Sequence, residues 1–490
     1  MLEREAKLVA RGGFDSNALI GACGDGEISR AGEEYLEAVY YDTQDLRLLR
    51  GGVSLRFRDG WMVKLAQPTD RPDLMQRMEI PVAGPQGIVP VEALDLVRPS
   101  TRGAELIPVA HLSTDRVTFV MRDAAGAEVA EIVFDRVVAG RPGEEPVEFD
   151  EIEVELAEAA PISALAPIIG RLREVGAGPA VLVPKLARAL EIEVAPAAPV
   201  VPELDEGAAA GDVVQAAIAG SVRRFLEHVP AVILDEDNEG VHQARVATRR
   251  LRSDLRTFRR FLDRRWADEL RVDLRAVTRL LGALRDLDVL KMHLAAVIDE
   301  VPEPERRAAE VIFSALEAER QDALRAVVQG FREPEFEVLL DSLVEACDRP
   351  EFSEAASSPA DPIVLKLALK PWRKVEAAVT ELPDEPRPEE LHRLRILVKR
   401  ARYAVEAVAL MGGAEAEEFA FRLSELQDVL GEHQDAIVAG AWLRRRDPLQ
   451  AAAAAELIEL EVARAGRAAE GWRALWNSAN TPELTAWLER

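Results

Sequence analysis

Charged and aliphatic residues alternate along several short segments in the first 190 residues of the sequence. Residues 3–7 read Glu-Arg-Glu-Ala-Lys, and residues 151–156 read Glu-Ile-Glu-Val-Glu-Leu. Because successive residues of a β-strand point to opposite faces, the ionisable residues of each segment would share one face. Gathered carboxylates are the ligands that a hard divalent cation such as Mg²⁺ prefers. These two segments are therefore candidates for a metal site.

Basic residues alternate in the same way between the two acidic segments. Arg56 and Arg58 are two residues apart, and Lys64 lies in the next aliphatic run. Cations beside a metal-binding carboxylate set would contact phosphate oxygens, and the two sets together supply the charge neutralisation that phosphoryl transfer requires. A single strand of this kind is more simply explained as one strand of a half-exposed sheet. That simpler explanation weakens when several strands repeat the pattern.

A second kind of charged pattern occurs in the latter half of the chain. Cations are spaced three and four residues apart in two segments, which places each set on one face of a helix. The first set is His242, Arg245, Arg249, Arg252, Arg256 and Arg259, and the second is His392, Arg395, Lys399 and Arg402. Between residues 242 and 265 there are nine Arg against two Asp, and residues 391–403 contain no acid.

These two basic stripes have a simple alternative explanation as solvated helix faces. A solvated face normally mixes signs, because like charges four residues apart repel each other. Nearly pure basic stripes, present twice in a chain of net charge −26, favour binding of a linear polyanion. Nucleic acid is disfavoured, because aromatic residues make up only 5% of the chain and single-strand binders interleave aromatics with basic residues. A phosphate chain needs cations without stacking surfaces.

Periodicity divides the chain into two parts. Short alternating runs separated by Gly, Pro and Asp indicate antiparallel strands up to about residue 190, and patterns of helical period begin near residue 212. The Pro- and Ala-rich stretch between them indicates a linker. The sequence therefore predicts an α+β chain with a first domain at 1–195, a linker at 196–211 and an all-α domain at 212–490.

The helical part repeats itself. His-Gln-Ala-Arg at 242–245 is matched by His-Arg-Leu-Arg at 392–395, and the Leu-Gly pair at 281–282 is matched at 430–431. Two matched signatures in the same order indicate an internal duplication, with halves at about 212–350 and 360–490. The period is too long for a solenoid and fits two similar four-helix bundles.

Composition sets broader limits. A chain of 490 residues exceeds one ordinary core, so two or three domains are expected. Cys23 and Cys347 are far apart and match no metal-ligand spacing, which indicates two reduced thiols. No segment approaches the ~18 uninterrupted apolar residues of a membrane span, and the first residues lack the apolar core of a secretory signal. We therefore expect a cytoplasmic protein that does not contact a membrane.

The first part resembles the CYTH family of triphosphate tunnel metalloenzymes. The ExExK motif at 3–7 is followed in order by YYDT (40–43), LRFR (55–58), VKL (63–65), MEIPV (78–82), FDRV (134–137), EIEVEL (151–156) and PKLARAL (184–190). The resemblance implies an eight-stranded antiparallel β-barrel whose tunnel holds a triphosphate and a divalent metal.

Residue roles follow from the matched CYTH motifs. The resemblance implies four catalytic residues, Glu3, Glu5, Lys7 and Glu79. It implies metal ligation by Glu3, Glu5, Asp135, Glu153 and Glu155. It implies phosphate contacts from Lys7, Arg56, Arg58, Lys64, Arg116 and Lys185.

The second part resembles the CHAD family of conserved-histidine α-helical domains. The motifs are HQARVATRRLR, LRDLDVL, LHRLRILVKRARY and LQDVLGEHQDA, in that order. The resemblance implies two pseudo-symmetric four-helix bundles with a basic face that binds inorganic polyphosphate. The implied contacts are His242, Arg245, Arg249, Arg252, Arg256, His392, Arg395, Lys399, Arg402 and His433.

We therefore expect an Mg²⁺- or Mn²⁺-dependent hydrolase of inorganic tripolyphosphate or short polyphosphate, with polyphosphate binding by the helical domain. Three alternatives stay open. The chain could be a polyphosphate receptor without catalysis, a thiamine triphosphatase or an adenylate cyclase. The sequence leaves the oligomeric state and the preferred chain length undetermined.

Overall fold

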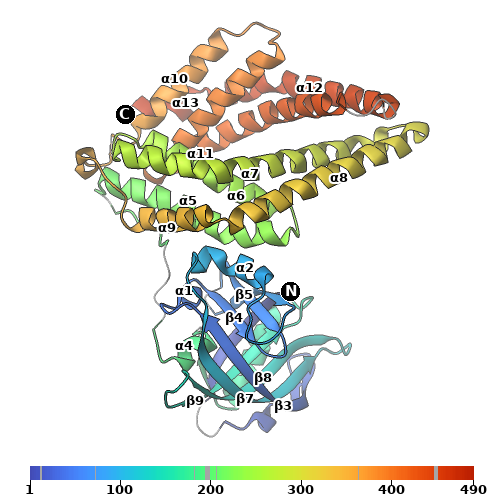
Figure 1. Cartoon of the computed structure of the whole chain (residues 1–490), viewed down its shortest axis with the longest axis vertical. Coiled ribbons are helices and arrows are strands. Elements are labelled where there is room, and N and C mark those ends of the chain that lie inside the picture. Colours follow the sequence, from blue (N-terminus) through green and yellow to red (C-terminus); the bar gives the residue numbers. More distant parts are fainter. Residues whose placement is uncertain are drawn as a thin grey trace. The chain divides into compact units, whose positions relative to one another are not determined.

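The structure is a computed structural model that describes residues 1–10, 14–71, 73–180, 183–193, 199–205, 207–361, 363–445 and 451–489. The chain forms two compact units, Met1–Ala197 and Ala198–Arg490 (Figure 1). The predicted linker at 196–211 lies partly outside the described residues, and its last residues begin a helix at Ala210.

The first unit is built mainly of strands. Its strands are β1 (Leu2–Ala10), β2 (Gly21–Cys23), β3 (Gly26–Asp42), β4 (Val53–Phe57), β5 (Trp61–Gln67), β6 (Met75–Val82), β7 (Ile107–Arg122), β8 (Glu128–Gly140), β9 (Val147–Leu156) and β10 (Ala177–Ala180). Its α-helices are α1 (Arg47–Arg50), α2 (Val91–Thr101), α3 (Leu165–Glu174) and α4 (Lys185–Ala189), with 3₁₀ turns at Ser16–Leu19 and Ile162–Ala164.

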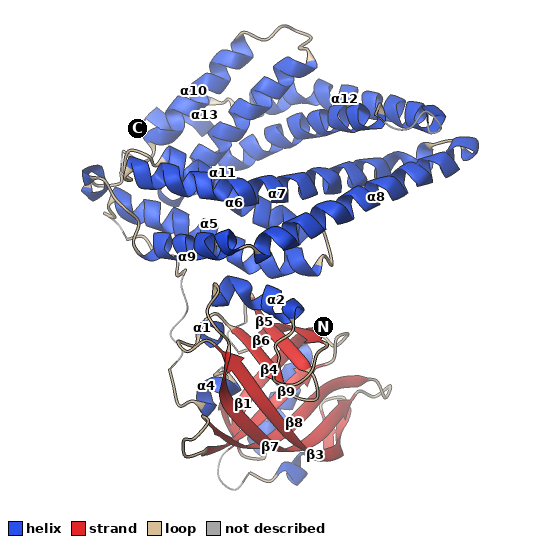
Figure 2. Ribbon diagram, in the orientation of Figure 1, coloured by secondary structure: helices blue, strands red, loops and turns tan. Residues whose placement is uncertain are grey.

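The strands form one antiparallel sheet that closes on itself (Figure 2). The order is β1-β6-β5-β4-β3-β7-β8-β9, and β9 pairs back with β1. Within the described residues this closed ring therefore has eight strands, while β2 pairs with β3 and β10 with β1. The predicted antiparallel sheet is confirmed. Closure has a consequence for function, because it places the first and last acidic segments on neighbouring strands.

Because aliphatic and ionisable residues alternate along these strands, the two faces of the ring differ, with aliphatic side chains outside and ionisable side chains inside. In the β1–β9 pair, Ala6 lies opposite Val154 and Leu8 lies opposite Ile152. These aliphatic residues pack outside the ring in a buried cluster that includes Ile168 of α3. Since neighbouring residues point the opposite way, the ionisable residues of both strands point into the ring.

Two strands are longer than the alternating runs predicted. β3 has 17 residues and β7 has 16, and the two pair along most of their lengths. Residues 29–35 of β3 are exposed, so no aliphatic alternation marked them as a strand. Backbone pairing with β7 holds this segment extended, which is a non-local cause that sequence periodicity does not record.

The second unit is all-helical, as predicted. Its helices are α5 (Ala210–Leu234), α6 (Glu239–Thr257), α7 (Arg264–Val297), α8 (Glu303–Arg332), α9 (Pro334–Asp348), α10 (Lys366–Thr380), α11 (Pro388–Leu443), α12 (Ala451–Ala479) and α13 (Pro482–Thr485). 3₁₀ turns occur at Ile298–Glu300, Glu354–Ser357 and Ala486–Glu489. Among the helices described, none is both long and apolar enough to cross a membrane.

The repeated motifs occupy matching places in this unit. The first pair of motifs lies on α6 and α7, which are separate helices. The second pair lies on the two parts of α11, which bends at Gly413, where φ is 57°. One hydrophobic core runs through both halves and includes Leu251 of α6 and Leu394 of α11. The two halves therefore fold against each other around a shared core.

A buried carboxyl group on α6 makes the stability of this unit pH-dependent. Asp254 has 0% exposure, and Ser221 donates to its Oδ2 over 3.2 Å. Its Oδ1 has no hydrogen-bond partner in the described part of the chain. Burial raises the pKa of Asp254 to about 7. At low pH the carboxyl is buried in its protonated, uncharged form, which favours the folded state. This contribution to the free energy of unfolding is lost as pH rises through about 7.

We expect Asp254→Asn to raise the unfolding temperature at pH values above 7. The reason is that an amide carries no charge to bury, whereas ionising a carboxyl whose pKa is raised from 3.8 to about 7 costs about 4 kcal/mol, at ~1.4 kcal/mol per pKa unit. Scanning calorimetry between about pH 5 and 8 measures the effect, which should shrink toward acid. Asp273→Asn, on the exposed side of α7, is the charge-matched control. Equal shifts in both variants would contradict the assignment.

Candidate functional site

The closed ring of strands encloses a cavity of about 500 Å³. Ten of the residues predicted for the site line it. They are Glu3, Lys7, Arg56, Arg58, Lys64, Glu79, Arg116, Glu153, Glu155 and Lys185. Glu5 and Asp135 are buried behind the lining, with 2% and 0% exposure. Closure of the ring thus gathers side chains separated by up to 180 positions into one chamber.

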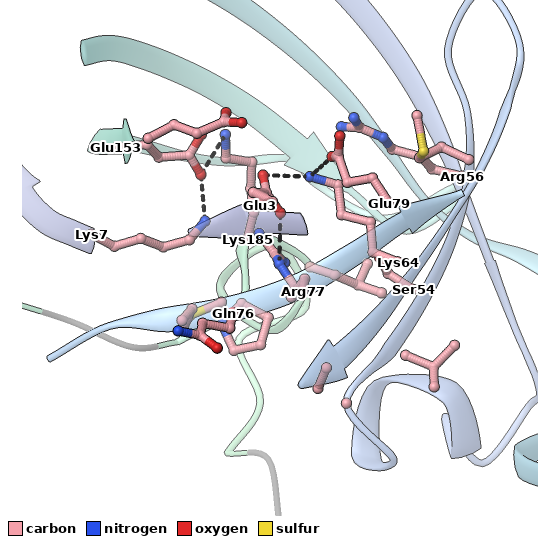
Figure 3. A pocket seen from close by; sticks show the side chains of 18 of the residues that line it. Glu3, Lys7, Ser54, Arg56, Lys64, Gln76, Arg77, Glu79, Glu153 and Lys185 are labelled. Atoms are coloured by element: carbon pink, nitrogen blue, oxygen red, sulfur yellow. Dashed lines mark hydrogen bonds and ion pairs between the residues drawn. The ribbon is translucent and has the colours of Figure 1, made fainter. Parts of the chain in front are cut away.

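One wall of the cavity is formed by β1 and β9. Lys7 lies directly opposite Glu153 and forms an ion pair with it (Figure 3). Lys7 Nζ also lies 3.4 Å from Glu151 Oε1. Burial alone would lower the pKa of Lys7, but the carboxylates of Glu153, Glu5 and Glu151 outweigh it and raise that pKa. Lys7 therefore stays charged although its side chain is only 2% exposed.

The adjoining wall is formed by β5 and β6. Lys64 Nζ lies 2.8 Å from Glu3 Oε1 and also pairs with Glu79. Arg77, which the sequence reasoning missed, lies 3.1 Å from Glu3 Oε2 through its Nε and forms a second ion pair with Glu5. Figure 3 shows Glu3 between the ammonium of Lys64 and the guanidinium of Arg77. The predicted catalytic carboxylates are thus held by the protein's own cations.

Asp135 positions two of the predicted phosphate contacts. Arg116 on β7 makes a bidentate pair with it, with Nε–Oδ1 and Nη2–Oδ2 distances of 2.8 and 2.7 Å. Lys185 Nζ lies 2.6 Å from Asp135 Oδ2. Lys185 is the first residue of α4, and the next residue, Leu186, is buried in the hydrophobic core. Both oxygens of Asp135 are occupied by cations, so its predicted role as a metal ligand stays a prediction.

Arg56 and Arg58 differ from the other cavity cations. In the described residues neither forms an ion pair with a carboxylate, and the buried Nε of Arg56 has no hydrogen-bond partner. Burial, together with the neighbouring charges of Arg56 and Arg116, lowers the pKa of Arg58. Guanidinium groups that repel one another inside a cavity would be stabilised by an anion. These two residues are the clearest anion-binding feature of the chamber.

Glu155 belongs to a row of neighbouring carboxylates. It lies opposite Glu5 on β1 and opposite Glu131 on β8, so three acids stand in register across three strands. Burial and the nearby charges of Glu3 and Glu79 raise the pKa of Glu155 to about 7. Like charges placed opposite each other destabilise a sheet. A hard cation coordinated by these oxygens would remove that repulsion.

The predicted metal ligands are not arranged for coordination while their present partners remain. Across the described residues, no group of three or more His, Cys, Asp or Glu side chains has a geometry that could hold a metal ion. The reason is visible in the ion pairs, since Lys and Arg nitrogens occupy Glu3, Glu5 and Glu153. The donor types suit Mg²⁺ or Mn²⁺, but binding requires some of these cations to move.

Sequence reasoning missed several residues that line the cavity. They are Glu34, Tyr40, Arg77 and Glu131. Arg77 precedes the predicted Glu79 by two residues on one strand, so the alternation rule was a usable signal for it. Glu34 lies in the exposed part of β3, where no alternation was visible. Burial would raise the pKa of Tyr40, but Arg56, Lys185 and Lys64 lower it.

In the second unit the two basic stripes meet. α6 and the first part of α11 pack side by side, and Arg249 of α6 donates a hydrogen bond to Tyr403 Oη of α11. The ring of Tyr403 lies between Arg249 and Arg402, whose guanidinium carbons are 5.4 and 5.3 Å from its centroid. The stripes therefore join into one basic face, which we define as the ten predicted polyphosphate contacts together with Tyr403.

Lys399 lies at the centre of this basic face. It is half-buried among Arg245 and Arg249 of α6 and Arg395 and Arg402 of α11. Burial and these four guanidinium groups lower the pKa of Lys399 to about 7. Such a concentration of like charge is poorly explained as a solvated surface.

The matched glycines of the two halves lie against matched arginines. A Cβ at Gly282 would be 3.9 Å from Arg245 Nε, and a Cβ at Gly431 would be 3.6 Å from Arg395 Nε. Each guanidinium thus lies beside a helix position that carries no side chain. Both distances are ordinary van der Waals contact, so they show matched Arg–Gly neighbours in the two halves and do not by themselves require glycine.

Acidic residues from other turns reduce the charge of the basic face. Arg245 lies 3.0 Å from Asp286 of α7, and Arg402 lies 3.1 Å from Glu406 of α11. These partners were not foreseen, because they lie outside the basic segments. Further cations missed by the sequence reasoning stand on α7 and approach His242 or Arg252. They are Arg271, Arg275 and Arg285.

The predicted histidines are partly or fully buried at this face. His433 has 5% exposure, and burial lowers its pKa. Burial and the charge of Arg285 lower the pKa of His242. The Nδ1 atoms of His392 and His433 have no hydrogen-bond partner in the described part of the chain. Both Nδ1 atoms are buried, so the predicted contacts of these histidines with an anion stay a prediction.

Comparison with known proteins identifies both domains. Residues 1–174 match the model of the CYTH domain, and residues 216–444 match the model of the CHAD domain. The chain is a CYTH–CHAD protein. The predicted order of the two domains is thereby confirmed. The CYTH match covers every predicted cavity residue except Lys185, and the CHAD match covers the whole predicted basic face.

Two relatives align with this chain over most of its length. Uncharacterized proteins of Mycobacterium tuberculosis strains CDC 1551 (MT2285) and H37Rv (Rv2226) are each 29% identical over 437 residues, covering 84% of this chain and 82% of theirs. PptA from Streptomyces chartreusis is 21% identical, with 55% of this chain and 100% of that chain covered and a TM-score of 0.47. The CHAD domain of the plant Ricinus communis is 23% identical, with 59% and 95% covered and a TM-score of 0.46.

Proposed function

We propose that the CYTH domain hydrolyses inorganic tripolyphosphate or short polyphosphate with Mg²⁺ or Mn²⁺. The observation that carries this proposal is the enclosed cavity that holds both a carboxylate set and two guanidinium groups, those of Arg56 and Arg58, that pair with no described carboxylate. Carboxylates alone would bind a cation, and guanidinium groups alone would bind any anion. A site with both, in one chamber of about 500 Å³, suits a metal-bound phosphate chain.

Each part of the cavity has a distinct task in this proposal. Arg56 and Arg58 bind the phosphate chain by charge-assisted hydrogen bonds, and Arg116 and Lys185 are held beside them by Asp135. Glu3, Glu5, Glu153 and Glu155 are the residues that would hold the metal. A bound divalent cation would neutralise charge on the phosphates and lower the pKa of a coordinated water.

The remaining charged residues organise the reaction. Lys7 is buried between Glu153 and Glu151. The charges of Lys185 and Lys7 outweigh burial and lower the pKa of Glu153. Lys64 lies between Glu3 and Glu79 and can stabilise negative charge on the departing phosphate.

The decisive experiment is phosphate release from tripolyphosphate by the full chain with Mg²⁺ or Mn²⁺. A metal-dependent release, suppressed by a chelator, supports hydrolysis. Binding of tripolyphosphate without any release would instead favour a polyphosphate receptor. Thiamine triphosphate and ATP belong in the same substrate panel, because cleavage of the first or cyclisation of the second would replace the proposed substrate.

We further propose that the CHAD domain binds polyphosphate along its basic face. The stripes of α6 and α11 meet at Tyr403, so that one linear anion could contact both. Arg249 and Arg395 present guanidinium groups without carboxylate ion pairs among the described residues. Binding at this face would raise the local concentration of substrate for the CYTH domain.

Polyphosphate binding by the CHAD domain should be linked to uptake of a proton by Lys399. In the free protein its pKa is about 7, because of burial and four neighbouring guanidinium groups. A bound polyanion restores the charged form, so affinity should fall as pH rises above 7 and level off below it. Calorimetry near pH 8 in buffers of different ionisation enthalpy should show uptake of about one proton.

Lys399→Arg is the informative variant for this linkage. Its guanidinium stays charged at all these pH values, so binding should lose both the proton uptake and the pH dependence above 7. Unchanged proton uptake in Lys399→Arg would contradict the assignment to this residue.

A further inference from the structure

Arg77 connects the two carboxylates at the start of the chain. It belongs to β6 and lies directly opposite Glu3 in the β1–β6 pair. Its Nε lies 3.1 Å from Glu3 Oε2, and its Nη2 forms an ion pair with Glu5 (Figure 3). One guanidinium therefore spans both acids of the Glu-x-Glu motif.

These oxygens are also the ones that the proposed function assigns to a divalent cation. A guanidinium and a metal ion compete for the same carboxylate oxygens, because each uses their lone pairs and the two positive charges repel each other. In the absence of a metal, Arg77 prevents Glu3 and Glu5 from being buried without a counter-charge. Replacement of Arg77 by a metal is therefore an exchange of one cation for another.

The carboxylates keep other partners when Arg77 moves. Lys64 Nζ lies 2.8 Å from Glu3, and Lys7 Nζ lies 3.7 Å from Glu5. Arg77 itself lines the cavity, and its side chain is 15% exposed. A displaced guanidinium would thus remain inside the chamber, where a phosphate chain would lie.

We propose that Arg77 competes with the divalent cation for Glu3 and Glu5, and that its displacement turns it into a phosphate contact. This inference rests on the proposed function of the same cavity. It makes Arg77 a positioning residue that opposes metal binding in the empty site. Metal and phosphate then favour the same arrangement of Arg77, so each promotes binding of the other.

The test is Mn²⁺ affinity of the full chain without phosphate, measured by electron paramagnetic resonance. Arg77→Gln should bind Mn²⁺ about tenfold more tightly than wild type, because the competing charge is gone. Arg77→Lys keeps a cation and should stay close to wild type. Glu3→Gln/Glu5→Gln measured in parallel identifies Mn²⁺ that binds elsewhere on the chain.

Arg188→Gln is the matched control. Arg188 also pairs with a buried cavity-side carboxylate, 3.1 Å from Glu151, but it does not contact Glu3 or Glu5. It should lower the unfolding temperature and leave Mn²⁺ affinity unchanged. If Arg77→Gln behaves in the same way, the role of Arg77 is structural and the inference is wrong. Because Mn²⁺ binding is measured without turnover, this result is independent of whether tripolyphosphate is hydrolysed.

Discussion

Replacing Glu3 and Glu5 together by glutamine is expected to reduce metal-dependent phosphate release from tripolyphosphate by roughly a thousandfold or more. The amides keep the size of the side chains but remove the charge that would hold a divalent cation. Arg77 would lose both of its carboxylate partners, and Lys64 would keep only Glu79, which adds uncompensated positive charge to the cavity. Release of phosphate against metal concentration measures the effect.

The loss must be separated from unfolding and from a change in net charge. Circular dichroism and the unfolding temperature establish that the double variant is folded. Glu148→Gln/Glu158→Gln is a charge-matched control, since both residues are exposed on the first unit. Full activity is expected of this control. A Glu3→Gln/Glu5→Gln protein that still releases phosphate at the wild-type rate would place the catalytic metal elsewhere.

Replacing Arg249 and Arg395 by glutamine is expected to weaken polyphosphate binding by about a hundredfold at moderate ionic strength. Charge-assisted contacts to phosphate are worth about 1.5–3 kcal/mol each, and part of that is screened at a partly exposed face. The two residues come from different halves of the CHAD domain, so both stripes are weakened at once. Fluorescence anisotropy with labelled polyphosphate measures the affinity.

The control for this pair is Arg265→Gln/Arg325→Gln. It removes the same net charge from exposed positions on α7 and α8, where both arginines pair with acids of their own helices. A decrease of less than about threefold is expected from the change in overall charge alone. Equal weakening by both double variants would mean that binding responds to total charge and does not use the basic face.

The paired variants also distinguish the two domains. Glu3→Gln/Glu5→Gln should leave polyphosphate binding by the CHAD domain intact, because the two sites share no described residue. Arg249→Gln/Arg395→Gln should leave release from short tripolyphosphate intact, and should affect only long chains held by the basic face. This separation follows from two sites with independent chemistry in one chain.

Periodicity alone determined which residues share a face. Alternation placed Glu3, Glu5 and Lys7 together, and spacings of three and four did the same for the cations of α6 and α11. This is possible because the direction of a side chain in a strand or helix is a local property of the backbone. The order of motifs also determined the family of each domain, which the comparisons confirm.

Tertiary structure decided which faces meet. Pairing of β1 with β9 closes the ring and sets Glu5 opposite Glu155, although the two lie 150 positions apart. Pairing of β7 with β8 sets Arg116 opposite Asp135, and pairing of β1 with β6 brings Arg77, unmarked in the sequence reasoning, against Glu3 and Glu5. Packing of α6 against α11 likewise joins the basic stripes and adds the acids Asp286 and Glu406. These contacts depend on strand register and helix packing between distant segments, and no local period encodes them.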